Sequence, residues 1–126
     1  MIESTPEIHI EVATRYLAHQ SDPEGSAYVH AYVITIHNRG DRPVQLLRRY
    51  WLITHGNGKR EEVEGEGVVG EQPWIAPGDY HRYTSGCVME DDVGTMEGHY
   101  TMQLENGETF QVAIPRFVLA IPRTVH

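Results

Sequence analysis

The sequence predicts an all-β protein, an antiparallel sandwich of two sheets. Segments rich in β-branched and aromatic residues recur at intervals of about ten residues, and Gly, Pro and Asn-Gly turn signals separate them. Apolar residues nowhere recur at helical spacing between capping residues, so we expect almost no helix. The 126 residues suffice for one domain with its own core, of which we expect 1–7 and 120–126 to be flexible ends.

Three long strands are expected in the first half of the chain, over residues 8–20, 28–37 and 44–54. In the first, apolar and polar residues alternate, as in a strand with one buried face. The second is apolar on both faces and rich in β-branched residues, which indicates a central strand. A loop over 21–26 and a turn over 38–43 connect them, and Gly40 is free to take a positive φ in that turn.

The second half is expected to hold four more strands, over residues 59–69, 80–85, 96–104 and 110–114. The segments 56–58 and 106–107, Gly-Asn-Gly and Asn-Gly, have the composition of tight hairpin turns. Pro77-Gly78 is typical of a type II turn, because Pro presets φ and Gly accepts the positive φ at the next position. Pro115 and Pro122 are expected to break up the C-terminal tail.

Charge and cysteine content limit the cellular compartments and the classes of partner that fit this protein. The formal net charge of −8 argues against nucleic-acid binding, and it disfavours polyphosphate ligands unless a divalent cation accompanies them. The single cysteine, Cys87, forms no intrachain disulfide, which fits a reducing compartment. The N-terminus lacks the pattern of a signal peptide, and no stretch approaches the roughly 20 apolar residues of a membrane span. We therefore expect a cytoplasmic protein that binds neither nucleic acid nor membrane.

Residues 65–70, Gly-Glu-Gly-Val-Val-Gly, match the dinucleotide-binding fingerprint in letters alone. That fingerprint needs a buried strand before it and a helix after it, whereas an acidic stretch precedes this one and Glu71-Gln72-Pro73 follows. The context excludes a Rossmann site. Two interpretations stay open: an architectural turn or bulge, or a backbone nest that binds an anion. The residues assigned to the nest are Gly65, Gly67, Gly70, Glu71 and Gln72.

No metal centre or cofactor is expected. The eight histidines do not pair at the spacings of a metal site, so each is interpreted as a surface or hydrogen-bonded side chain. Acidic residues gather around the glycine motif and again at 90–92, where weak binding of Mg²⁺ competes with the simpler hypothesis of a solvated surface.

No catalytic set is evident either. Residues 83–87, Tyr-Thr-Ser-Gly-Cys, offer hydroxyls and a thiol without the base and orienting group that would activate them. Cys87 is interpreted as a small buried apolar residue. We therefore expect a protein that is not an enzyme. An enzyme acting on nucleotides is the least favoured hypothesis, and His81 and Cys87 are the residues on which it would depend.

Trp74 is the best candidate for an exposed aromatic residue. It lies between Pro73 and the Pro77-Gly78 turn, and an exposed Trp beside a rigid turn is typical of interface anchors. The alternative is a Trp side chain folded back over the edge of the sandwich. We assign an interaction surface to Trp74, Pro77 and Gly78.

Nearly the whole chain resembles the bacterial ApaG family. The resemblance rests on Gly-x-Gly-x-x-Gly-Glu-Gln-Pro at 65–73, Tyr-Thr-Ser-Gly-Cys at 83–87 and Gly-x-Met-x-Gly-x-Tyr-x-Met at 94–102, with further likeness at 38–47, 50–54 and 114–119. It departs from the family at 90–93, where a Thr-Pro pair is usual. The resemblance implies a fibronectin type III or immunoglobulin-like sandwich.

The resemblance also implies functions. ApaG-like domains fused to F-box proteins and to a DNA-polymerase-interacting protein suggest an adaptor, so the favoured hypothesis is a non-catalytic module that binds another protein. The family is linked to cobalt resistance and magnesium efflux, in which a domain of this size has at most an indirect role. The alternative hypothesis is that the glycine motif binds phosphate or a diadenosine polyphosphate, with or without a divalent cation, because the family's gene neighbours a diadenosine tetraphosphate hydrolase.

Overall fold

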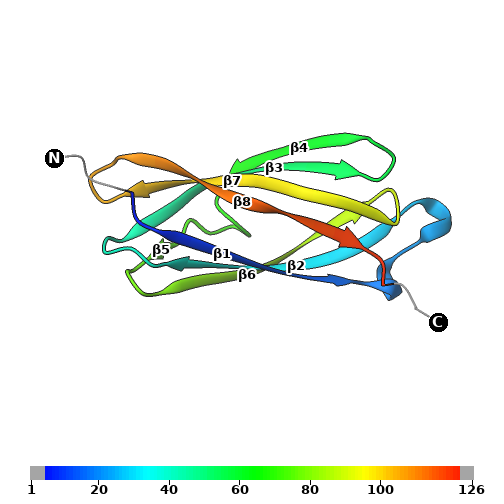
Figure 1. Ribbon diagram of the computed structural model, residues 1–126, viewed down its shortest axis with the longest axis horizontal. Coiled ribbons are helices and arrows are strands. Elements are labelled where there is room, and N and C mark those ends of the chain that lie inside the picture. Colours follow the sequence, from blue (N-terminus) through cyan, green and yellow to red (C-terminus); the bar gives the residue numbers. More distant parts are fainter. Residues whose placement is uncertain (1–4, 123–126) are drawn as a thin grey trace.

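The structure, a computed structural model, describes residues 5–122, whose strands form two layers packed face to face (Figure 1). Two single-turn 3₁₀ helices, Ala18–Gln20 and Pro23–Gly25, lie between the first two strands. The eight strands are β1 (Ile8–Tyr16), β2 (Tyr28–Asn38), β3 (Val44–His55), β4 (Arg60–Glu66), β5 (Trp74–Ile75), β6 (Tyr80–Met89), β7 (Val93–Leu104) and β8 (Thr109–Ala120).

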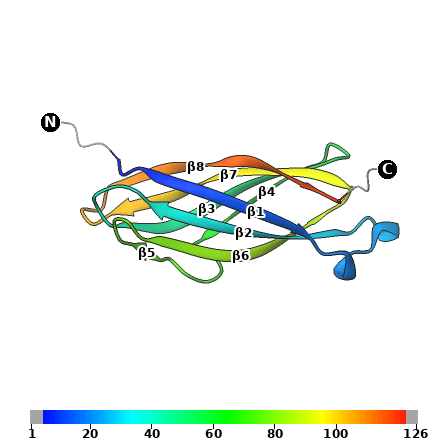
Figure 2. The same ribbon diagram turned by 60° about the horizontal axis from the view of Figure 1, so that its bottom comes forward.

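One layer is a three-stranded sheet in the order β1-β2-β6, and the other has the order β4-β3-β7-β8 with β5 paired to the start of β3. All pairings are antiparallel. Figure 2 shows the same two layers from a second direction. The predicted all-β sandwich of fibronectin type III-like architecture is confirmed.

The core lies between the inner faces of the two sheets. Residues of β2 with even numbers point inward, so that Ile34 and Ile36 have no exposed surface, and they meet Leu46 and Tyr100 from the other layer. Trp51 lies at the centre, where its ring contacts those of Tyr32, 5.7 Å away, and Phe117, 5.8 Å away. This alternation of buried and exposed positions fixes the register of each strand.

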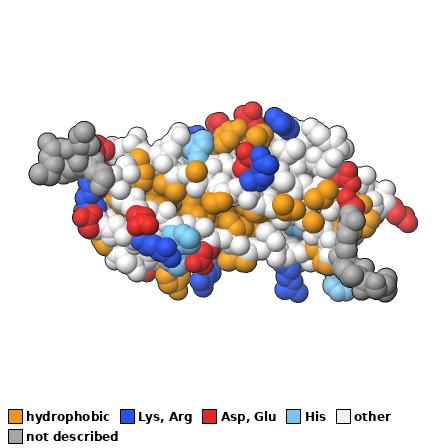
Figure 3. Space-filling view, viewed as in Figure 1, with side chains coloured by type: hydrophobic (Ala, Val, Ile, Leu, Met, Phe, Trp, Pro, Cys, Tyr) orange, Lys and Arg blue, Asp and Glu red, His pale blue; other side chains and the backbone are white. Residues whose placement is uncertain are grey.

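The side of the sandwich formed by β1 and β8 is closed by side chains, because these two strands belong to different sheets. Figure 3, in the view of Figure 1, shows hydrophobic side chains in a band along the middle of this face. Partly buried residues of both strands pack against the core here, among them Ile10 and Val12 of β1 and Phe110 and Val112 of β8. Among the described residues, no helix is both long and apolar enough to span a membrane.

Two strand predictions were wrong. The strand expected over 8–20 ends at Tyr16, and 18–20 are a 3₁₀ turn; Ser21 Oγ fixes the bend by donating to the Leu17 carbonyl at 2.8 Å and accepting from Val29 N–H. Pro115 does not break the chain, because β8 continues through it to Ala120. A register shift places Pro115 and Arg116 opposite the single residue Glu97, a bulge on an edge strand where a proline costs no sheet hydrogen bond.

Smaller differences concern strand ends and turns. The strand expected over 59–69 ends at Glu66, those expected over 80–85, 96–104 and 110–114 are longer, and the short β5 was not predicted. Gly40 does not take a positive φ; a Cβ there would lie 2.5 Å from the Cβ of Pro6, so glycine allows close packing instead. In the predicted flexible ends, Pro6 is buried and Ala120 ends β8, while 1–4 and 123–126 lie outside the described residues.

Candidate functional site

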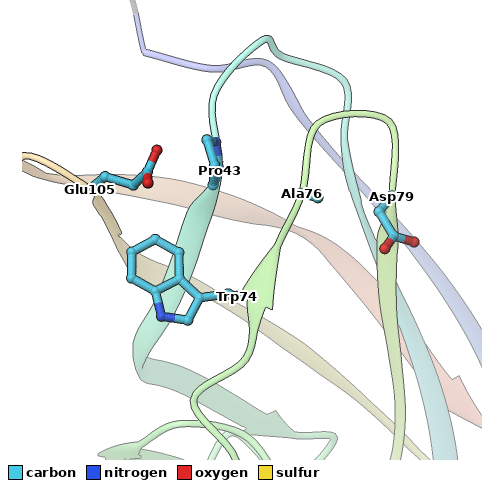
Figure 4. A pocket seen from close by; sticks show the side chains of 5 residues that line it. All are labelled: Pro43, Trp74, Ala76, Asp79 and Glu105. Atoms are coloured by element: carbon cyan, nitrogen blue, oxygen red, sulfur yellow. The ribbon is translucent and has the colours of Figure 1, made fainter.

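A surface pocket of about 470 Å³ lies at the end of the sandwich where β3 begins (Figure 4). Four segments that are distant in sequence meet there: the β2–β3 loop, β5, the β5–β6 turn and the β7–β8 turn. Its lining residues are Pro43, Trp74, Ala76, Asp79 and Glu105. Figure 4 shows Trp74 and Glu105 beside Pro43 at one end of the pocket and Asp79 at the other, beyond Ala76.

Trp74 is held outward by its neighbours in β5. Ile75 is 1% exposed and anchors this strand in the core, so alternation turns Trp74 to solvent, where half of its surface is exposed (51%). The backbone is fixed because Trp74 pairs with Gln45 of β3 and the Pro73 carbonyl accepts from Leu46 N–H at 3.0 Å. Of the two alternatives for this side chain, the structure has the exposed one.

A buried asparagine, Asn38, joins three of the four segments around the pocket. Its Nδ2 donates to the Arg42 carbonyl at 2.8 Å and to the Ile75 carbonyl at 2.9 Å, and its Oδ1 accepts from Gly40 N–H at 3.0 Å. Only 1% of Asn38 is exposed; its bond to the Ile75 carbonyl is buried, and the other two are partly buried. The sequence predicts only a turn at Asn38, although an Asn that begins a turn often bonds the amide two residues on, as this one does.

The backbone of Asn38 also holds the Pro77–Gly78 turn. Its N–H donates to the Asp79 carbonyl at 2.9 Å, and its carbonyl accepts from Gly78 N–H at 2.8 Å. The predicted type II turn is confirmed: Gly78 has φ +81°, and Asp79 N–H donates to the Ala76 carbonyl at 3.0 Å. Pro77 and Gly78 are both exposed beside the pocket. The predicted surface of Trp74, Pro77 and Gly78 is therefore one continuous segment held by Asn38.

The two ionisable side chains that line the pocket are both carboxylates. Asp79 accepts the N–H of Tyr80 through Oδ1 at 2.8 Å, which leaves its second oxygen available. Glu105 projects from the exposed β7–β8 turn, which Gly107 N–H closes on the Leu104 carbonyl at 3.0 Å. The pocket thus combines an exposed indole ring with negative charge.

The glycine motif is a tight turn at the end of β4. Val68 and Glu71 exchange two backbone hydrogen bonds, of 2.8 and 3.0 Å, around Val69 and Gly70, which both have positive φ. Gly67 N–H donates to the Leu47 carbonyl at 2.7 Å. An anion nest needs converging amides that are free, and three amides of this segment are engaged. The geometry favours the architectural interpretation of the motif.

The remaining predicted ligand residue, Gln72, takes part in the same anchoring. A β-bulge between Leu46 and Arg48 leaves Leu47 out of register with β7. The Leu47 carbonyl accepts from Gln72 Nε2 at 3.0 Å as well as from Gly67 N–H. A Cβ on Gly67 would lie 2.2 Å from the Glu71 carbonyl oxygen, so only glycine fits there.

Within the described residues, His55, Glu61 and Glu90 are the one group of three whose side chains converge closely enough for a metal ion. They lie at the opposite end of the sandwich from the pocket. The Glu90 N–H donates to His55 Nδ1 at 2.9 Å, so the ring proton lies on Nε2. His55 Nε2 donates to Glu61 Oε1, 2.5 Å away. A metal ligand needs a lone pair on Nε2. The group therefore fits a set of hydrogen bonds that joins the β3–β4 hairpin to the β6–β7 loop better than it fits a metal centre.

The structure does not bring His81 and Cys87 together. They lie on β6 six positions apart, which separates them by about 20 Å. Cys87 pairs instead with His30 of β2. Burial raises the pKa of Cys87 to about 11 and lowers the pKa of His30. An activated thiolate–imidazolium pair requires the opposite shifts.

Comparisons with known proteins agree on one family. Residues 18–104 match the model of the ApaG domain. The chain is 54% identical over 123 residues to proteins named ApaG from Escherichia coli O1:K1 and from Shigella boydii serotype 18, covering 98% of both sequences in each case. It also superposes on the crystal structure of a Bordetella pertussis protein, named as ApaA, with a TM-score of 0.91 at 46% identity, covering 94% of this chain and 97% of the other.

Proposed function

The chain belongs to the ApaG domain family, and we propose that it is a non-catalytic binding module that holds a protein partner at the Trp74 pocket. The observation that carries this proposal is the half-exposed indole of Trp74 in a pocket where Asn38 fixes three of the four segments, the β2–β3 loop, β5 and the β5–β6 turn. An exposed aromatic residue on a rigid support is the usual form of an interface anchor.

The shape of the pocket supports a protein partner over a free small molecule. Sites for small molecules bury most of the ligand surface and are lined by many side chains. Only five residues line this pocket, and Trp74, Ala76, Asp79 and Glu105 are all exposed. Such a site encloses one side chain of a partner, while the rest of the partner lies on the surrounding turns.

Preorganisation supports the same conclusion. Ordering loops on binding costs free energy, and a surface that is already ordered avoids that cost. The β2–β3 loop and the β5–β6 turn are joined through five hydrogen bonds of Asn38, three from its side chain and two from its backbone. The pocket is thus presented in one conformation.

The proposal is tested by comparing two exposed aromatic residues. Trp74 and Tyr80 are each 51% exposed, but only Trp74 lines the pocket. Immobilised wild type, Trp74→Ala and Tyr80→Ala are incubated with an extract of the source cell, and retained proteins are quantified by mass spectrometry. Each retained candidate is then purified, and its affinity for the three proteins is measured by calorimetry.

We expect a partner whose affinity falls about 30-fold or more with Trp74→Ala, as for an interface hot spot, and is unchanged with Tyr80→Ala. As a control, circular dichroism and thermal unfolding are measured for both variants to check that they keep the fold. Partners that bind all three proteins equally, or that lose affinity only with Tyr80→Ala, would contradict the proposal.

A further inference from the structure

The chemistry of the Trp74 pocket indicates what kind of side chain enters it. The five lining residues include two carboxylates, Asp79 and Glu105, and no basic group. The chain as a whole has a formal net charge of −8, so the surrounding field also attracts cations. The indole face of Trp74 carries the negative side of the ring quadrupole, which attracts cations over the ring. All three features select a positively charged occupant.

We propose that the pocket binds an arginine side chain in a basic segment of the partner protein, stacked on Trp74 and paired with Glu105. This inference rests on the proposed function and adds the chemistry of the partner. Arginine fits better than lysine because its planar guanidinium stacks on an aromatic ring and is weakly hydrated, so that less solvation is lost on entry. The same planar group donates two parallel hydrogen bonds to one carboxylate.

The arrangement of the pocket assigns separate roles to the two carboxylates. Trp74 and Glu105 lie together beside Pro43, so one guanidinium reaches both the ring and a carboxylate (Figure 4). Asp79 lies at the far end, beyond Ala76, with one oxygen engaged by Tyr80 N–H. It therefore pairs with a second cationic or amide group of the same segment. Apolar contact of the arginine stem with Pro43 and Ala76 completes the fit.

The probe for this inference is a library of random twelve-residue peptides displayed on phage, selected on the immobilised wild-type protein. Selected peptides are synthesised, and their affinity is measured for wild type, Trp74→Ala, Glu105→Gln and Glu108→Gln. Glu108 is the matched control, because it is an exposed carboxylate on the same hairpin that does not line the pocket. Protection of Trp74 from acrylamide quenching localises binding, since the other tryptophan, Trp51, is 3% exposed.

We expect the selected peptides to share an arginine. Exchanging it for citrulline, which keeps the shape and removes the charge, should weaken binding about tenfold, as should Trp74→Ala. Glu105→Gln should weaken binding about fivefold, and Glu108→Gln should leave it unchanged. Agmatine, the free small cation, should bind far more weakly than the peptides.

The outcomes separate this inference from the proposed function. Peptides that need Trp74 but tolerate citrulline or Glu105→Gln would overturn the arginine assignment and leave the protein-binding function standing. Agmatine that binds as tightly as the peptides would identify a small cation as the occupant and overturn both. A selection that yields no peptide sensitive to Trp74→Ala would also overturn both.

Discussion

Replacing Asn38 with alanine tests whether this residue holds the pocket together. The substitution removes two donated hydrogen bonds, to the carbonyls of Arg42 and Ile75, and one accepted from Gly40 N–H. Asn38 is 1% exposed, and its bond to the Ile75 carbonyl is buried, so water compensates that carbonyl little; the Arg42 carbonyl and Gly40 N–H are partly buried. The perturbation acts on the β2–β3 loop and on β5, and leaves the sandwich core in place.

The magnitude follows from the three lost bonds. At about 1 kcal/mol net for each, Asn38→Ala should reduce the free energy of unfolding by about 3 kcal/mol. For a chain of 126 residues, the entropy of unfolding converts each kcal/mol into about 4 °C of Tm. We therefore expect Tm to fall by about 12 °C. Amide exchange should accelerate at Gly78 and Asp79, whose segment loses its support from Asn38.

Asn106→Ala is the matched control. Asn106 also begins a turn and accepts from the backbone, Glu108 N–H at 2.9 Å, but it is exposed and makes one such bond. Its loss should cost less than about 1 kcal/mol. Chemical and thermal unfolding followed by circular dichroism compares the two variants, and hydrogen exchange by NMR locates the change. If Asn38→Ala costs no more than Asn106→Ala, Asn38 does not organise this end of the sandwich.

Three further predictions concern other parts of the molecule. Val69 is a β-branched residue whose backbone is strained at φ +48°, and 65% of its surface is exposed. Val69→Gly should therefore relieve backbone strain and stabilise the protein by about 1 kcal/mol. Unchanged or lowered stability in urea unfolding would show that the backbone at this position is not strained. Cys87, with its pKa raised to about 11, loses its proton only as pH rises toward that value, so at pH 8 its thiolate fraction is roughly 100-fold below that of a free thiol. Labelling by a disulfide reagent should therefore be slow in the native protein and fast in urea, and equal rates would contradict burial of the thiol. In long-range ¹H–¹⁵N spectra, the His55 ring should carry its proton on Nε2 and not on Nδ1. Added Zn²⁺ should leave the signals of both ring nitrogens unmoved. The reverse tautomer would remove the argument against a metal ion at His55.

Sequence reasoning succeeded where structure depends on nearby residues. The alternation in β1 and the dipeptide Pro77-Gly78 were interpreted correctly, because strand period and turn chemistry are local properties. It failed where neighbours in space decide. The chain bends after Tyr16 where the Leu17 carbonyl accepts from Ser21 Oγ, and Pro115 is tolerated only because β8 is an edge strand with a bulge.

The candidate site was foreseen in part for the same reason. Trp74 was identified from its own neighbours, Pro73 and the following turn. Glu105 and Pro43 join it only because β3 begins, and β5 and β7 terminate, at one end of the sandwich, which depends on sheet order. Sequence periodicity gives no information on sheet order, and no residue pattern marks Asn38 as the link between the β2–β3 loop, β5 and the β5–β6 turn.

The glycine motif and the Trp74 pocket are structurally linked, because the motif helps to anchor the short strand that carries Trp74. After β4 the chain must leave an edge strand, turn back and rejoin the start of β3 as the two-residue β5. A two-residue strand supplies too few hydrogen bonds to hold itself. The additional attachment comes from the bulge at Leu47, whose carbonyl binds Gly67 N–H and Gln72 Nε2. The spacing of Gly67 and Gln72 thus fixes where Trp74 leaves the sheet, and this gives the fingerprint-like sequence a role that needs no bound phosphate.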